Sequence, residues 1–142
     1  MSINLLVPLD GSPAALRAVD WLIAALPGWR VAPTVHLLNV QPSLHGDIGR
    51  FVSAEQLAQY HSDEGRKALA EGADRLRGAG LTVHEHVVVG ESAPTIVEVA
   101  QREQCQQIII GTRGHGGFAG VLLGSVASRL ASISPLPVTL IR

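Results

Sequence analysis

The stretch from Gly111 to Ser125, GTRGHGGFAGVLLGS, combines many glycines with a position between a predicted buried strand and a predicted helix. Glycine lets the backbone approach a ligand closely, and successive backbone N–H groups in such a loop form a concavity that binds anions. The helix that follows points the positive end of its dipole at the same place. This combination predicts a polyphosphate site, in which Ser125 caps the helix, binds a phosphate oxygen or does both. The alternative is a glycine-rich surface loop without a ligand.

The common phosphate-binding fingerprints are absent from the sequence. There is no GxxxxGK[ST] motif, so the chain has no P-loop. The first strand–helix turn, LDGSP, also lacks the GxGxxG of a dinucleotide-binding fold. What remains is the spacing G-x2-G-x9-G-S, formed by Gly111, Gly114, Gly124 and Ser125.

A scaffold for this loop is predicted by apolar runs that alternate with helical patterns along the chain. Strands are expected at residues 3–9, 34–40, 81–89, 107–111 and 138–141. Helices are expected to begin at Ser12-Pro13, at Ser53, at Glu91 or Ser92, and at Ser125, which serves as a cap. The alternation predicts an α/β fold with an open, parallel, doubly wound sheet and helices on both faces.

Composition excludes several classes of protein. The 142 residues are 46% hydrophobic and 16% charged, with a formal net charge of -1, so neither nucleic acid nor an anionic membrane is an expected partner. The single cysteine, Cys105, forms no intramolecular disulfide, which suits a reducing compartment. The N-terminus lacks the basic region of a signal peptide, and no apolar run reaches the roughly 20 residues of a membrane helix. A cytoplasmic location is therefore expected.

The glycine spacing belongs to a wider resemblance, which is strongest at residues 5–18, 108–117 and 124–141. These segments contain LLVPLDGSPAALRA, IIIGTRGHGG and the closing SPLPVTLI. As a set they resemble the universal stress protein family, and the retained Gly111, Gly114, Gly124 and Ser125 resemble its ATP-binding branch. The similarity extends over the whole chain, so residues 1–142 are expected to form one universal stress protein domain.

The resemblance implies a Rossmann-like, five-stranded parallel sheet in the order 3-2-1-4-5, with two helices on each face. Its ligand is expected at the carboxyl ends of strands one and four, where the strand order reverses. By similarity the ligand is ATP with Mg²⁺ or Mn²⁺, and Asp10 lies near the ribose or the metal. The residues implied to bind ATP are Pro8, Asp10, Val40, Ile110, Gly111, Arg113, Gly114, His115, Gly124, Ser125 and Val126.

Several of these side chains have a simpler interpretation. The simpler interpretation of Asp10 is a turn at the start of the first helix, although a ligand role is favoured. Arg113 is as compatible with an exposed surface position as with a phosphate. His84 and His86 have a spacing that can bind Zn²⁺, but no third ligand is evident nearby, and exposed edge residues are the favoured interpretation. Cys105 is expected to be a small buried apolar residue.

The favoured function is a nucleotide-dependent regulatory module of a stress response. One alternative is a slow ATPase or phosphotransfer protein, for which Ser125, Arg113 and Asp10 provide no convincing general base. The other is a protein-interaction domain with an empty pocket. AMP and cyclic AMP are not excluded as ligands. A homodimer is expected through the last strand, 138–141, because it ends the chain at a predicted sheet edge.

Overall fold

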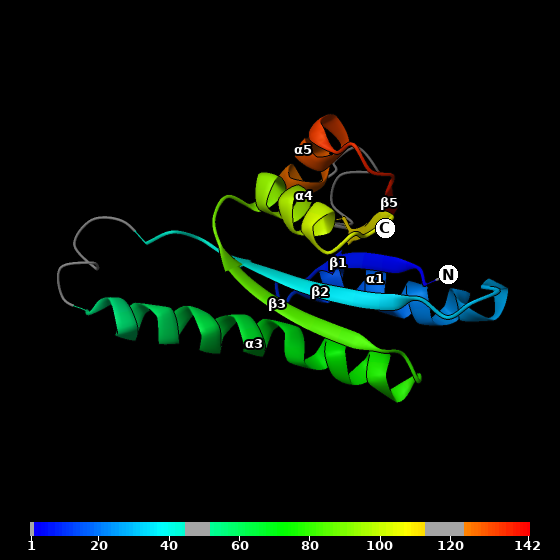
Figure 1. Ribbon diagram of the computed structural model, residues 1–142, viewed down its shortest axis with the longest axis horizontal. Helices are drawn as coiled ribbons and strands as arrows, with labels where there is room; N and C mark the ends of the chain where they lie inside the picture. Colours follow the sequence, from blue (N-terminus) through cyan, green and yellow to red (C-terminus); the bar gives the residue numbers. More distant parts are fainter. Residues whose placement is uncertain (1, 45–51, 113–123) are drawn as a thin grey trace.

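Five parallel strands form a single sheet in the order β3-β2-β1-β4-β5. The structure, a computed structural model, describes residues 2–44, 52–112 and 124–142 (Figure 1). The strands are β1 (Asn4–Pro8), β2 (Thr34–Gln41), β3 (Val83–Val89), β4 (Gln107–Gly111) and β5 (Val138–Ile141). The order confirms the expected Rossmann-like topology, with the reversal between β1 and β4.

The strands form where apolar residues are continuous, because both faces of the sheet are covered. β1 pairs with β2 over its whole length, from Asn4 opposite Thr34 to Pro8 opposite Leu38. On its other side β1 pairs with β4, where Leu5 lies opposite Gln107. β3 forms one edge of the sheet and has several exposed residues, as its polar sequence predicts.

The helices are α1 (Pro13–Ala25), α3 (Ala54–Gly78), α4 (Ser92–Arg102) and α5 (Ser125–Ile133), with a 3-10 turn η1 at Leu26–Gly28. Ser12 caps α1, and Ser53 forms a capping box with Gln56 at the start of α3, as expected from sequence. The expectation that Ser125 caps α5 is wrong. Gly124 occupies the cap position with extended backbone, and Ser125 is already the first helical residue.

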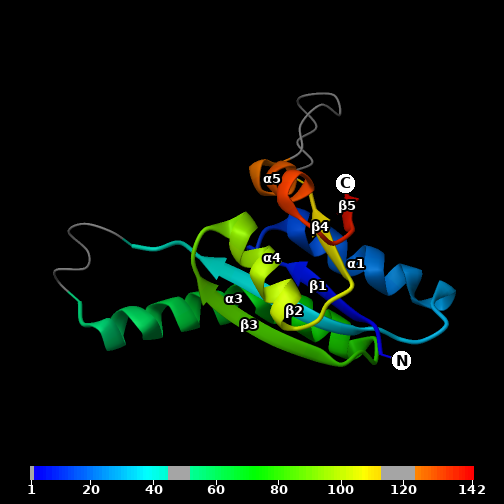
Figure 2. The ribbon, with the colours of Figure 1, turned by 45° about the horizontal axis from the view of Figure 1, so that its top comes forward.

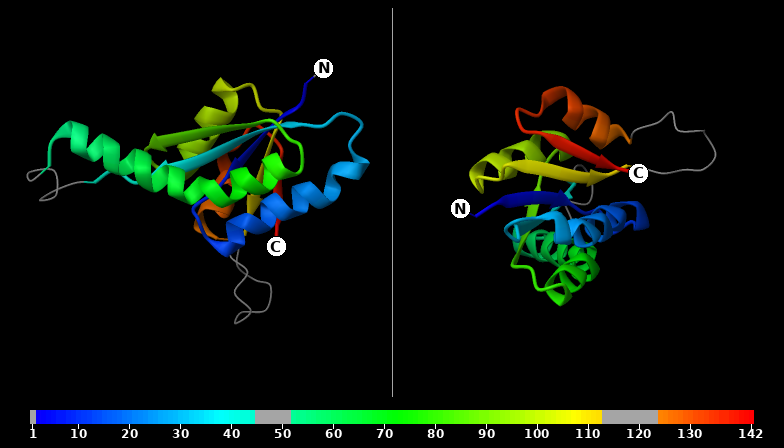
Figure 3. Two further views of the ribbon diagram at one scale, coloured as in Figure 1. Left: turned by 90° about the horizontal axis from the view of Figure 1, so that it is seen from below. Right: turned by 90° about the vertical axis from the view of Figure 1, so that its right-hand side faces the viewer.

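Two helices cover each face of the sheet. The right-hand view of Figure 3 shows α4 and α5 on one side of the strands and α1 and α3 on the other. One core contains buried residues of α1 and α3, and the other contains buried residues of α4 and α5. Successive side chains of β2 alternate between the two cores: Leu37 belongs to the first core and Leu38 to the second.

Figure 2 shows α4 lying over β1 and β2. The N-terminal part of α3 continues beyond the sheet in Figure 1, and most of its side chains there are exposed. Among the described residues, no helix is both long and apolar enough to cross a membrane.

Candidate functional site

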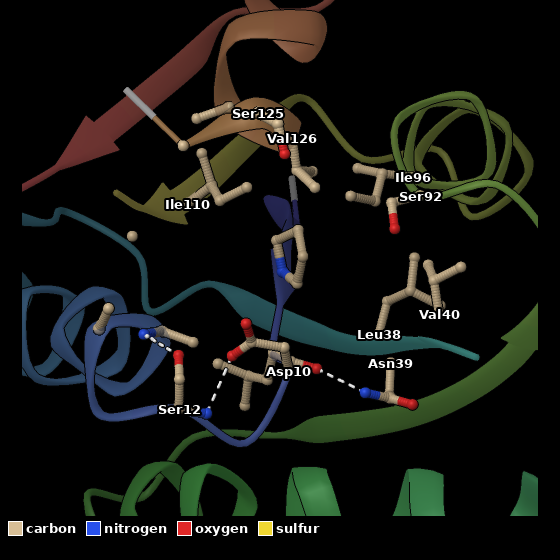
Figure 4. Close-up of a pocket in the computed structure, with 17 residues that line it drawn as sticks. Asp10, Ser12, Leu38, Asn39, Val40, Ser92, Ile96, Ile110, Ser125 and Val126 are labelled. Carbon is tan, nitrogen blue, oxygen red and sulfur yellow. Dashed lines mark hydrogen bonds between the residues drawn. The ribbon is translucent and has the colours of Figure 1, made fainter. Parts of the chain in front are cut away.

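A pocket opens at the carboxyl ends of β1 and β4, at the point where the strand order reverses (Figure 4). The hollow measures about 680 Å³, including the solvent at its mouth. Its lining residues are Pro8, Leu9, Asp10, Ser12, Ala14, Ala15, Leu38, Asn39, Val40, Ser92, Ile96, Ile110, Gly111, Gly124, Ser125, Val126 and Ala127.

Three helices begin at this pocket. Ser12 and Ala14 belong to the start of α1, Ser92 is the first residue of α4, and Ser125 is the first residue of α5. The N-terminus of a helix carries a partial positive charge and unpaired N–H groups. The three ends together favour a negatively charged ligand.

The starts of α4 and α5 are more open to an anion than that of α1. Ser12 accepts a hydrogen bond from the Ala15 amide at 3.2 Å, so α1 has a side-chain cap. In the part of the chain that the structure describes, no side chain caps α5 in this way. Its first residues, Ser125 and Val126, both line the pocket. A phosphate group at this place would meet backbone N–H donors that a cap would otherwise occupy.

Asp10 lies on the opposite wall of the pocket (Figure 4). Its Oδ1 accepts a hydrogen bond from the Ser12 amide at 2.9 Å, which is the turn that the sequence offered as the simpler interpretation. The turn uses one carboxylate oxygen, and the side chain is exposed at the pocket. The turn therefore holds the carboxylate in place without burying it, which leaves it able to meet a hydroxyl group or a metal ion.

An apolar wall faces these polar groups. Leu38 and Val40 of β2, Ile96 of α4, Ile110 of β4 and Val126 of α5 contribute to it. Leu38 is fully buried, and Ile110 is 7% exposed. A flat, weakly polar group such as a nucleobase is suited to a wall of this kind, while charged groups are suited to the helix ends.

Comparison with known proteins agrees with this geometry. A family model described as the universal stress protein family matches residues 1–142. The chain belongs to this family. Universal stress protein MJ0531 of Methanocaldococcus jannaschii is 27% identical over 140 residues, which cover 98% of this chain and 81% of that relative.

Solved structures of similar proteins share the fold. That of hypothetical protein MJ0577 has a TM-score of 0.80 and 27% identity, and the match covers 99% of this chain and 96% of that one. A universal stress protein solved in complex with cyclic AMP has a TM-score of 0.70 and 30% identity, with 99% and 97% of the two chains covered. The chain spans about half the length of the mycobacterial universal stress proteins that it matches.

The predicted site residues within the described part of this universal stress protein all line the one pocket. They are Pro8, Asp10, Val40, Ile110, Gly111, Gly124, Ser125 and Val126. Arg113, Gly114 and His115 lie outside the described residues. Three strands, two strand–helix connections and the start of α5, far apart in sequence, thus bring the predicted residues together.

Sequence reasoning missed Asn39 and Ser92, which also line the pocket. Asn39 is 4% exposed, and its Nδ2 donates to the Leu9 carbonyl at 2.8 Å, while Gln41 Nε2 donates to its Oδ1 at 2.6 Å. The first bond ties Leu9, which follows β1 and precedes Asp10, to β2, and the second orients the Asn39 amide. The available signal was a single amide residue inside the apolar run VHLLNV. Ser92 carried no comparable signal.

Gly111 has a structural role that the glycine spacing did not predict. A Cβ atom at this position would overlap the Ala14 carbonyl oxygen and lie 3.2 Å from the Ala15 Cα. The end of β4 therefore packs directly on the backbone of the first turn of α1. Glycine is required here for space, which also sets the distance between two walls of the pocket.

Proposed function

We propose that this universal stress protein binds ATP, with Mg²⁺ or Mn²⁺, and acts as a nucleotide-dependent regulatory module of a stress response. One observation carries the proposal. The N-terminus of α5, which has no side-chain cap among the described residues, lies in the same pocket as the Asp10 carboxylate and an apolar wall. Anion-binding, hydroxyl- or metal-binding and base-binding surfaces thus occur together, and a nucleotide contains a group for each.

In this proposal the adenine base lies against Leu38, Val40 and Ile110. Asp10 binds the ribose or the metal ion through the carboxylate oxygen that its turn leaves available. The phosphates lie at Gly124, Ser125 and Val126. The predicted contributions of Arg113, Gly114 and His115 remain part of the proposal.

AMP and cyclic AMP contain the same adenosine group and compete with ATP as candidates. A similar universal stress protein, 30% identical, was solved in complex with cyclic AMP. The glycine spacing 111, 114, 124, which leads into the start of α5, favours a ligand with several phosphates. The number of phosphates is therefore the property that an experiment must measure directly.

The purified chain should release an adenine nucleotide when it is denatured. Chromatography with mass detection identifies the nucleotide, and we expect ATP or ADP close to one per chain. Gly124→Val places a branched side chain at the start of α5 and should reduce the yield and the ATP affinity at least tenfold.

Gly28→Val is the matched control, because Gly28 is exposed and a Cβ there meets nothing within 4 Å. An empty protein whose melting temperature does not change with ATP and Mg²⁺ would favour the interaction-domain alternative. Release of AMP or cyclic AMP alone would support the pocket as a nucleotide site and exclude ATP as its ligand.

We also propose a homodimer, formed through β5, in the cytoplasm. β5 pairs with β4 on one side, and within the described residues no strand pairs with its other edge. All four of its residues are half-buried. An apolar strand with a free edge is suited to pairing with a second copy. Sedimentation equilibrium should give twice the chain mass, and a monomer at all concentrations would exclude the dimer.

A further inference from the structure

A cluster of ligand-type side chains lies on the α4 face of the sheet, away from the pocket. β2 and β3 are in register, with His36 opposite His84 and Leu38 opposite His86, so the three histidines share one face. α4 begins at the pocket with Ser92 and ends at the other end of the sheet, where Glu103 follows it. The helix thereby brings a carboxylate to the histidines.

The distances in this cluster are short. His36 Nδ1 lies 3.0 Å from His86 Nε2, and His86 Nε2 lies 3.9 Å from Glu103 Oε1. One ligand atom from each of these residues lies within 4.8 Å of the others. The sequence interpretation of two exposed edge residues holds for His84, whereas His86 is half-buried and lies beside two further ligand-type side chains. The other two ligands are His36 of β2 and Glu103, the residue that follows α4, and His84 is not among the three.

We propose that His36, His86 and Glu103 form a binding site for a divalent transition-metal ion, with Zn²⁺ the best fit. Zn²⁺ lies about 2.0–2.1 Å from histidine nitrogen and carboxylate oxygen, so two ligands of a tetrahedral site are about 3.3 Å apart. The observed separations of 3.0 and 3.9 Å lie on either side of that value. Small side-chain rotations, chiefly of Glu103, complete the site.

Two histidines and one carboxylate leave a fourth position for water, as in zinc sites with three protein ligands. The surroundings allow it, because the exposed fraction of the side chain is 28% for Glu103 and 17% for His86. His36 is 7% exposed. The site thus has a buried base and one side that is open to solvent, through which an ion enters.

Two further residues adjoin the ligands. His84 lies beside His36 with ring centroids 4.9 Å apart but contributes no atom to the cluster. Arg102 Nε lies 3.7 Å from Glu103 Oε2, which leaves Oε1 on the side of His86. The positive charge of Arg102 weakens the binding of a cation nearby, so all three ligands are needed to hold the ion.

The histidine rings are available as neutral ligands. Burial lowers the pKa of His36, and the neighbouring His86 and His84 add to this, against an opposing effect of Glu103. Burial also lowers the pKa of His86, with Glu103 again opposing. Without metal, the N–H of one facing nitrogen donates a hydrogen bond to the other nitrogen. A bound ion replaces that hydrogen bond once the proton has moved to the other nitrogen of its ring.

Zinc titration of the purified full chain, treated first with EDTA and then dialysed, tests this site. Competition with a chromophoric chelator should give one Zn²⁺ per chain. His86→Gln and Glu103→Gln should each weaken the affinity at least tenfold. His84→Gln is the matched control, since it removes a neighbouring exposed histidine from the same strand, and should change the affinity less than threefold.

Two further measurements separate binding from folding. Thermal unfolding without metal shows whether each variant folds, and Glu103 lies at the end of a helix, where a glutamine is readily accepted. Co²⁺ in place of Zn²⁺ should produce visible absorption bands of a four-coordinate site, which Glu103→Gln weakens. The proposal is overturned if no Zn²⁺ binds, or if His84→Gln loses as much affinity as His86→Gln. A folded Glu103→Gln with unchanged zinc affinity would also exclude this ligand set. None of these outcomes depends on nucleotide binding.

Discussion

Gly111→Ala should lower the free energy of unfolding by about 1–3 kcal/mol, the usual effect of forcing extra volume into a packed site. It should also weaken ATP binding at least tenfold. The added Cβ overlaps the Ala14 carbonyl oxygen, which is backbone and cannot rotate away. β4 and the first turn of α1 must therefore separate, and both line the pocket. Urea unfolding measures the first effect and an ATP titration the second.

Gly78→Ala is the matched control for this change. Gly78 is the last residue of α3, and a Cβ there meets nothing within 4 Å. Alanine should leave the stability unchanged or raise it by up to about 1 kcal/mol, because glycine is a poor helix former. If Gly111→Ala were as stable as the wild type, the tight packing of β4 on α1 would be incorrect. If it were less stable but bound ATP normally, the pocket walls would not be set by this contact.

The fold could be predicted largely from local patterns. β4 at Gln107–Gly111 and β5 at Val138–Ile141 have the expected bounds, because short apolar runs between polar or proline residues are clear signals. The predicted helix starts at Ser12-Pro13 and at Ser53 were also correct, because capping residues are local signals too. The strand order came from the family resemblance, since alternation predicts a parallel sheet without its order.

Predictions that depended on contacts between distant residues were less complete. Ser125 was expected to be the cap of α5, and Gly124 fills that position because its backbone is extended while Ser125 is helical. Asn39 was missed because its role depends on a bond to Leu9, a residue 30 positions away. The crowding at Gly111 depends on where α1 packs, which no local pattern contains.

The histidine cluster shows the same limit more strongly. His36 and His86 are 50 residues apart, and their contact requires both the β2–β3 register and the position of α4. The sequence pair His84 and His86 was noticed, but the second histidine of the cluster is His36 and not His84. A strand register error of one residue would have moved these side chains to the other face.

Leu38→Ala and Leu37→Ala should each lower the free energy of unfolding by about 2–5 kcal/mol, and only Leu38→Ala should also weaken ATP binding, by about tenfold. Both side chains are fully buried, so each truncation leaves a cavity in a core. They point to opposite faces of β2, because side chains alternate along a strand. Leu38 lines the pocket, and Leu37 packs in the other core, with residues of α1 and α3.

Each leucine thus serves as the control for the other. Urea unfolding gives the stability of the two variants, and ATP titrations at a temperature where both are folded give their affinities. An equal loss of affinity in both would mean that loosening of the fold, and not the apolar wall, weakens binding. An unchanged affinity in Leu38→Ala would place the base elsewhere in the pocket. A tenfold loss in Leu38→Ala alone corresponds to about 1.4 kcal/mol of binding free energy, and it would locate the base on the face of β2 that the sheet turns toward α4 and α5.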